Sequence, residues 1–155
     1  MNRMEIRRAF EACEFFRGMD PAFLHDIADL GRLEVYEPGQ YIYRQGESGE
    51  WIYILAEGHV YLERTLDLGP RKGSVAVAML GKGKVFGCWS TLLGKSHEYM
   101  CSAACDKPTR AIAVKGSDLR AMMLRNTSFG FKVLENLCLT LCERIQGVYG
   151  AMERI

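Results

Sequence analysis

The sequence has no surplus of either charge and no long apolar run. Its 20 lysines and arginines nearly balance 19 aspartates and glutamates, for a formal net charge of +1, whereas domains that bind nucleic acid without sequence preference are strongly basic. No segment approaches the roughly 20 consecutive apolar residues that span a bilayer. Charged residues also interrupt the N-terminal segment, as they would not in a secretory signal. We expect a cytoplasmic protein that contacts neither nucleic acid nor a membrane directly.

The motifs of most catalytic and metal sites are missing as well. The chain has 3 histidines, and they do not form the His-x-His motif of cupin-like enzymes. The pairs Cys101/Cys105 and Cys138/Cys142 lie in apolar runs, not in the turns that carry structural zinc sites. We therefore expect no enzyme activity, no metal and no cofactor. The 6 cysteines are interpreted as reduced thiols buried in the core.

What the sequence does contain is a hydrophobic period that changes twice along its 155 residues. Helical spacing predicts a first helix over 3–15. A second helix is predicted from Pro21 to Leu30, with Asp20 capping its first turn and Gly31 ending it.

Beyond the second predicted helix, the period becomes two, which is typical of β-strands. β-Branched and aromatic segments alternate with turns rich in glycine. Short strands with turns this frequent indicate an antiparallel sandwich, barrel or roll. The predicted strands span residues 33–36, 40–43, 51–55, 59–64, 74–80, 84–86, 98–104 and 110–114.

After residue 114 the pattern is helical again. Ser117 is predicted to cap a helix that runs to Leu124, and a break at 126–128 precedes one long helix over 129–152. The long helix carries a heptad-like apolar seam, which predicts a homodimer; packing of the seam on the chain's own roll is the alternative. The seam consists of Leu134, Leu137, Leu141, Ile145 and Val148.

Together these segments predict an α+β, mainly β, fold in one structural domain. A jelly-roll-like antiparallel β-roll of about eight strands is flanked by N-terminal helices and by two C-terminal helices. The expected ranges are 1–32 for the N-terminal helices, 33–115 for the roll and 116–155 for the C-terminal helices.

This arrangement resembles the cyclic nucleotide-binding domain, the sensor roll of catabolite-activator-type regulators, cyclic-nucleotide-dependent kinases and gated channels. The resemblance covers residues 10–150 and is most specific at Pro38-Gly39, Gln45-Gly46-Glu47, the 51–55 strand and Glu57-Gly58. It implies a regulatory module in which a ligand at a phosphate-binding cassette repositions the C-terminal helices. The resemblance places that cassette in residues 80–105.

The resemblance also implies the ligand-binding positions. A glycine lets the backbone turn closely, and a short helix then presents free N–H groups to an anion. The implied cassette positions are Phe86, Gly87, Cys88, Trp89, Ser90, Thr91, His97, Glu98 and Tyr99, with Tyr61 and Met100 as further pocket candidates.

The cassette departs from the family pattern at two positions. The family's glutamate, which holds the ribose hydroxyl, is replaced by Cys88, and its phosphate-binding arginine falls on His97 or Glu98. A carboxylate at that point repels a phosphate, and a histidine is a weaker cation. We therefore expect ordinary cyclic AMP or cyclic GMP to bind poorly. The remaining side chains favour an aromatic or hydrophobic effector, or no ligand at all.

The sequence thus predicts a ligand-responsive regulatory module. A genuine receptor for cyclic AMP or cyclic GMP is the first alternative, and a ligand-free interaction module is the second. Catabolite-activator-type regulators continue past the long helix into a helix-turn-helix module, whereas this sequence ends at Ile155. The expected output is therefore a protein partner and not DNA.

Overall fold

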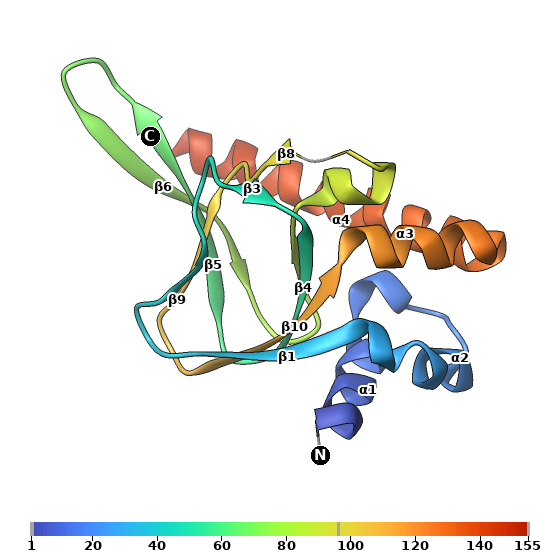
Figure 1. Ribbon diagram of the computed structural model, residues 1–155. Helices are drawn as coiled ribbons and strands as arrows, with labels where there is room; N and C mark the ends of the chain where they lie inside the picture. The colour runs from blue at the N-terminus through green and yellow to red at the C-terminus, as the bar shows by residue number, and fades with distance from the viewer. Residues whose placement is uncertain (1, 96, 155) are drawn as a thin grey trace.

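The computed structural model describes residues 2–95 and 97–154. Its strands form a roll, and its helices gather along one side of that roll (Figure 1). The helices are α1 (Asn2–Ala12), α2 (Pro21–Asp26), α3 (Gly116–Arg125) and α4 (Thr127–Glu153), with 3-10 turns η1 (Glu14–Phe16), η2 (Ala28–Leu30) and η3 (Trp89–Leu93). The strands are β1 (Gly31–Tyr36), β2 (Tyr41–Tyr43), β3 (Ser48–Gly49), β4 (Trp51–Glu57), β5 (Val60–Asp67), β6 (Lys72–Leu80), β7 (Val85–Gly87), β8 (His97–Glu98), β9 (Ser102–Cys105) and β10 (Thr109–Lys115). This order confirms the predicted α+β roll.

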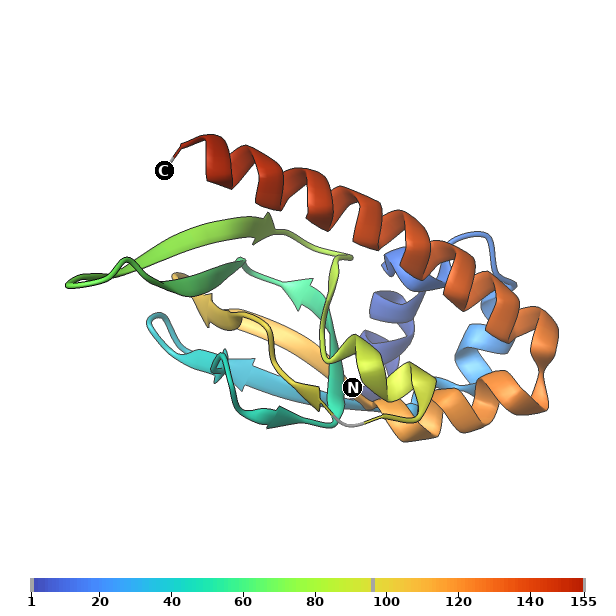
Figure 2. The ribbon, with the colours of Figure 1, turned by 90° about the horizontal axis from the view of Figure 1, so that it is seen from above.

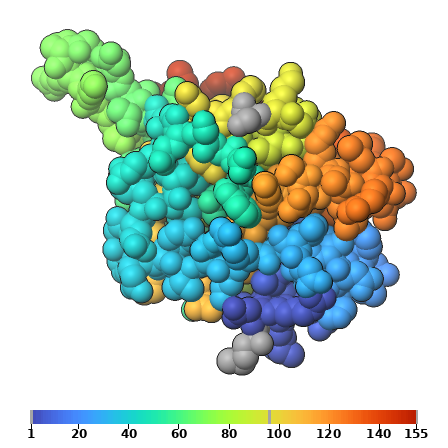
Figure 3. Space-filling model, in the orientation of Figure 1, coloured from blue at the N-terminus to red at the C-terminus, as the bar shows by residue number. Residues whose placement is uncertain are grey.

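The strands form two antiparallel sheets of four strands and one small pair. The first sheet has the order β1-β10-β4-β7, the second has the order β2-β9-β5-β6, and β3 pairs with β8. The hairpin of β5 and β6 is the longest pairing and extends beyond the body of the roll, as Figures 1 and 3 show. Its inner half therefore belongs to the roll, while its tip stands in solvent.

Alternation along the central strands divides the apolar side chains between two cores. On β4, Ile52 and Ile54 face the helices, whereas Tyr53 and Leu55 face the roll interior. Successive residues of a strand point to opposite faces of the sheet. One sheet thus joins the helical core to the core of the roll.

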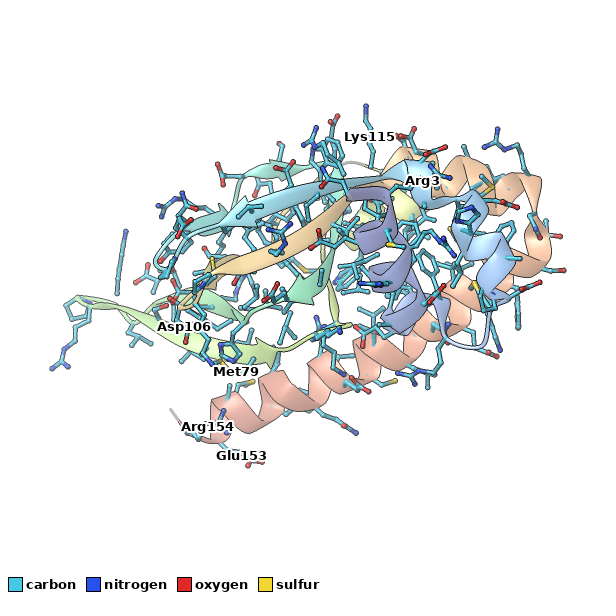
Figure 4. The ribbon with its side chains drawn as sticks, turned by 90° about the horizontal axis from the view of Figure 1, so that it is seen from below. Arg3, Met79, Asp106, Lys115, Glu153 and Arg154 are labelled. Carbon is cyan, nitrogen blue, oxygen red and sulfur yellow. The ribbon has the colours of Figure 1, made fainter. Side chains whose placement is uncertain are left out.

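Helix α4 runs along the outside of the roll and lies beside β6, as Figure 2 shows from above. Figure 4 shows the same helix from below, with Glu153 and Arg154 at its C-terminal end. A side chain at Gly147 would place its Cβ 3.0 Å from the backbone oxygen of Val77. The helix therefore meets β6 closely at a position that only glycine fills without displacement.

The helix ends differ from the sequence predictions. The first helix stops at Ala12, and η1 follows, because the side chain of Glu14 turns inward to accept a hydrogen bond from the amide of Val85. The cap at Asp20 is confirmed, since its carboxylate accepts from the amide of Ala22. Ser117 is not a cap: the strand β10 leads directly into α3, whose N-cap is Lys115.

The predicted strand over 98–104 is wrong as a single element. Residues 97–98 pair with β3, and residues 102–105 pair with β2 and β5 in another sheet. Between them the backbone of Tyr99 bonds to Glu47 and Gly46, at 2.8 and 2.9 Å. Its ring turns into the roll, so the chain changes sheets at this residue.

Gly87 ends β7 in a backbone conformation, and in a space, that only glycine fits. Its φ is +131°, and a Cβ there would lie 2.6 Å from the carbonyl oxygen of Trp51. Both the conformation and the lack of space exclude a side chain. We expect Gly87→Ala to lower the free energy of unfolding by about 2 kcal/mol or more, measured by urea denaturation.

Gly81→Ala is the matched control. A Cβ at Gly81 meets no atom within 4 Å, so its effect should stay within about 0.5 kcal/mol. Equal denaturation midpoints for the two variants would contradict this account of Gly87.

Candidate functional site

The cassette begins where β7 ends and η3 starts. The amide of Cys88 donates to the carbonyl of Trp51 at 3.1 Å, and the hydroxyl of Thr91 donates to the carbonyl of Cys88 at 2.8 Å. Phe86 is fully buried in the roll core. These bonds hold the turn against β4.

Cys88 and His97 face each other across the cassette. The Cys88 side chain is buried, and its thiol donates to the backbone oxygen of His97 at 3.4 Å. The ring nitrogen Nδ1 of His97 lies 2.6 Å from the hydroxyl of Ser90. Cys88, at the ribose position that the resemblance implies, and His97, one of the two candidates for the phosphate position, are thus bonded to the cassette itself.

Glu98 and Tyr99 take opposite directions. Glu98 is exposed and shares a surface hollow with Arg64 and His97. Tyr99 is buried, and its ring stacks on that of Tyr43 with centroids 3.8 Å apart. Burial raises the pKa of the Tyr99 phenol above its usual value, so it stays protonated at neutral pH. Aromatic rings therefore fill the part of the roll beneath the cassette.

A cavity of about 520 Å³ lies between the roll and α4. Strands β5 and β6 form one wall, and α4 forms the other. Its volume is within the range of small-molecule sites, which span roughly 300–1,000 Å³. The lining residues are Tyr43, Leu62, Arg64, Val77, Ala78, Gly87, Trp89, Met100, Cys101, Leu141, Arg144, Ile145, Val148 and Tyr149.

The structure brings only some of the predicted site residues to this cavity. Gly87, Trp89 and Met100 line it. The rest of the predicted ligand set does not line it: Phe86, Cys88, Ser90, Thr91, His97, Glu98, Tyr99 and Tyr61. The cassette as a whole is therefore beside this cavity and supplies only part of its edge.

The charged side chains of the cavity are the ones that sequence reasoning missed. Arg64 projects from β5 and Arg144 from α4, and no acidic residue is among the described lining residues. Neither belongs to the cassette segment. A signal was present in the pattern, because Arg144 interrupts the apolar seam directly before Ile145.

Arg144 is held at the meeting point of three elements. Its Nη2 donates to the backbone oxygen of Val85 at 2.7 Å and lies 3.5 Å from a carboxylate oxygen of Glu14. Burial lowers the pKa of the guanidinium, while the Glu14 carboxylate acts in the opposite direction. Among the described atoms, Nη1 is buried without a hydrogen-bond partner.

The proposed dimer seam is divided between the inside and the outside of the molecule. Leu137 is buried in the chain's own core, so it is unable to meet a second copy in this arrangement. Leu141, Ile145 and Val148 line the cavity, and Leu134 is exposed. The alternative of packing on the chain itself thus holds for Leu137.

The prediction of buried cysteines is wrong for α4. Cys138 and Cys142 are exposed, because they lie on the side of the helix away from the roll. Cys13, Cys88 and Cys105 are buried as expected, and Cys101 is partly buried. Within the described part of the chain, no group of three or more His, Cys, Asp or Glu side chains is placed to hold a metal ion. The same residues include no helix long and apolar enough to cross a membrane.

Comparison with known proteins gives one family. A family model described as the cyclic nucleotide-binding domain matches residues 33–126. The cyclic AMP receptor protein of Thermus thermophilus is 30% identical over 131 residues, which are 84% of this chain and 56% of that protein. The cyclic nucleotide-gated channel beta-3 of Canis lupus familiaris is 28% identical over 126 residues, which are 74% of this chain and 16% of the channel. The chain thus spans between a sixth and somewhat over half of these relatives.

A solved structure gives the same fold. The cyclic nucleotide-binding domain from Methylobacillus flagellatus superposes with a TM-score of 0.77 at 18% identity, covering 96% of this chain and 80% of that one. At this identity the likeness establishes the fold alone.

The buried carboxylate of Glu14 joins η1, β7 and α4 beside the cavity, and its contribution to stability can be tested. It accepts from the Val85 amide at 2.9 Å and lies 3.5 Å from the ammonium of Lys84 and from the guanidinium of Arg144. Its removal leaves a buried cation without its partner. We expect Glu14→Ala to lower the free energy of unfolding by about 3 kcal/mol, measured by chemical denaturation.

Glu143→Ala is the control for the loss of a carboxylate near the same lysine. Glu143 lies 3.4 Å from Lys84 with 55% of its side chain exposed, so its loss should cost less than about 1 kcal/mol. Similar losses in both variants would show that the burial of Glu14 contributes nothing.

Proposed function

The chain belongs to the cyclic nucleotide-binding domain family, and from that premise we propose that it is a sensor that binds a small molecule between the roll and α4. The observation that carries this proposal is the cavity itself, because one of its two walls is the long C-terminal helix. A ligand that contacts both walls stabilises the docked position of α4 relative to any other. The position of α4 is then what an output partner reads.

We propose a regulatory role and no catalysis. The described lining is mostly apolar and offers two guanidinium groups, with no carboxylate or imidazole to act as a base. The output is a protein partner, since a net charge of +1 provides no attraction for nucleic acid. We place the protein in the reducing cytoplasm, where cysteines stay as free thiols like those of this chain.

Binding of ordinary cyclic nucleotides should be weak, because Cys88 and His97 bond to the cassette itself and a carboxylate stands at position 98. The names of the relatives favour the rival function, a cyclic AMP receptor. Isothermal titration with cyclic AMP and cyclic GMP separates the two. We expect no dissociation constant below about 10 μM, or 7 kcal/mol; tighter binding of either nucleotide would establish the rival.

Dimerisation through α4 is the second part of the proposal. Outside the chain's own core, apolar and thiol side chains follow one another at spacings of three and four along the exposed side of the helix, as in a coiled-coil seam. A second copy of the same helix is self-complementary to such a row. The exposed row comprises Phe131, Leu134, Cys138, Cys142, Ile145, Tyr149 and Met152, of which Ile145 and Tyr149 also border the cavity.

Light scattering of the protein at tens of micromolar should give twice the chain mass of 17.5 kDa. Leu134→Glu places a charge in the exposed row and should yield the monomer. Leu68→Glu, at an exposed leucine of the distant β5–β6 hairpin, should remain a dimer. A monomer for the unaltered chain, or a dimer for Leu134→Glu, would remove this part of the proposal.

A further inference from the structure

We propose that the cavity under α4 binds a small organic carboxylate with an aromatic or branched apolar body, whose carboxylate pairs with Arg64 and Arg144. This inference rests on the proposed function, because it names the ligand class of the same cavity. It assigns the anion to a strand and a helix outside the cassette.

The charged side chains of the cavity favour an anionic ligand. Arg64 and Arg144 bring two positive charges to the cavity, and none of its described lining residues is acidic. A carboxylate in the cavity therefore meets guanidinium groups and no carboxylate of the lining, while Glu14 pairs with Arg144 from outside that lining. The planar guanidinium group is suited to this role, because its fork of N–H donors matches the two oxygens of a carboxylate.

Arg144 has one hydrogen-bond donor without a partner among the described atoms. Nη2 of Arg144 donates hydrogen bonds to the backbone oxygen of Val85 and to the carboxylate of Glu14. Nη1 of the same side chain is buried and lacks a partner among the described atoms. A buried donor left unpaired is costly, so an acceptor supplied by a ligand relieves this cost.

The rest of the cavity lining is apolar or aromatic. Leucine, valine, isoleucine and methionine side chains surround its centre, and the rings of Tyr43, Trp89 and Tyr149 border it. Trp89 lies with its ring centroid 6.0 Å from the guanidinium carbon of Arg144. An aromatic acid places its ring among these side chains while its carboxylate reaches the arginines.

The same lining argues against a nucleotide. A ribose and a purine present several hydroxyl and nitrogen groups, and each needs a polar partner once it is removed from water. Apart from the two arginines, the described lining offers only the phenols of Tyr43 and Tyr149, the indole N–H of Trp89 and the thiol of Cys101 as polar side-chain groups. A compact carboxylate leaves no such group unsatisfied.

Arg64 and Arg144 stand on opposite walls. Arg64 is on β5 and donates to the backbone oxygen of Met100, whereas Arg144 is on α4. A carboxylate that pairs with both bridges the roll and the helix. Binding should therefore slow hydrogen exchange in α4, because the bound molecule favours the docked helix.

Calorimetry with phenylacetate, indole-3-acetate and 3-phenylpropionate, each beside its neutral amide, tests the charge requirement. We expect at least one acid to bind with a dissociation constant below about 100 μM and its amide to bind at least tenfold more weakly, a difference of about 1.4 kcal/mol. Hydrogen exchange on the same samples reports protection of α4.

Arg64→Gln and Arg144→Gln should each weaken binding of the acid at least tenfold and leave the amide unaffected. Arg144 also contacts Glu14 and Val85, so its variant is checked for folding by thermal denaturation, and Arg64→Gln carries the test if it unfolds. Arg71→Gln, at the exposed tip of the β5–β6 hairpin, is the matched control and should bind as the unaltered chain does.

The carboxylate inference is overturned if no acid binds, if the amides bind as tightly as the acids, or if Arg64→Gln keeps full affinity. Amides that bind and protect α4 would overturn this inference while supporting the proposed sensor function. If neither acids nor amides bind or protect α4, both are contradicted.

Discussion

The buried carboxylate of Glu14 is the interaction on which the placement of the helices around the roll depends. It joins η1 to β7 through the Val85 amide, and it joins both to α4 through Arg144. A carboxylate in a buried position requires its hydrogen bonds and its cation together. Only one relative position of these three elements supplies them. A second bond, from the Asn136 amide to the backbone oxygen of Phe15 at 2.7 Å, ties α4 to the same N-terminal segment.

Arg144 takes part in the contacts that join α4 to η1 and β7, and it also lines the cavity. Its contacts with Glu14 and Val85 hold α4 against the roll, and its side chain also lines the space beneath the helix. A ligand that engages Arg144 therefore acts on the group that sets the position of α4. In the proposed sensor, a single side chain therefore joins the ligand to α4, so coupling between them needs no long chain of contacts.

The architecture was predictable from the sequence because successive side chains of its strands differ in character with a period of two, which is typical of β-structure. On β4, the period of two places isoleucines against the helices and Tyr53 and Leu55 inside the roll, and the same signal recurs on the other strands. The cap at Asp20 was predictable because it depends on neighbouring residues only. Such features are local, and a sequence displays local features directly.

The cavity was not predictable in the same way. Arg64 and Arg144 are 80 positions apart in the chain, and nothing local links a strand residue to a helix residue at that distance. The burial of Cys138 and Cys142 was predicted wrongly for a related reason: the apolar run containing them does not reveal which side of α4 meets the roll. Close approach at Gly147 and the bond from Asn136 decide that side. Contacts between residues distant in the sequence thus determine both the position of the cavity and the side of α4 that meets the roll.

The stacking of Tyr99 on Tyr43 explains why the cavity lies where it does. The two rings, 3.8 Å apart, fill the interior of the roll beneath the cassette, and Gly49 leaves room for Tyr99 because a Cβ there would lie 2.3 Å from its ring. With that space filled by the chain itself, the open volume shifts outward, to the gap between β6 and α4. In the cassette itself, the Cys88 thiol bonds to the backbone of His97 and the His97 ring bonds to Ser90. In the proposed sensor, α4 is one wall of the binding cavity, so the element that contacts the ligand is also the element that carries the signal.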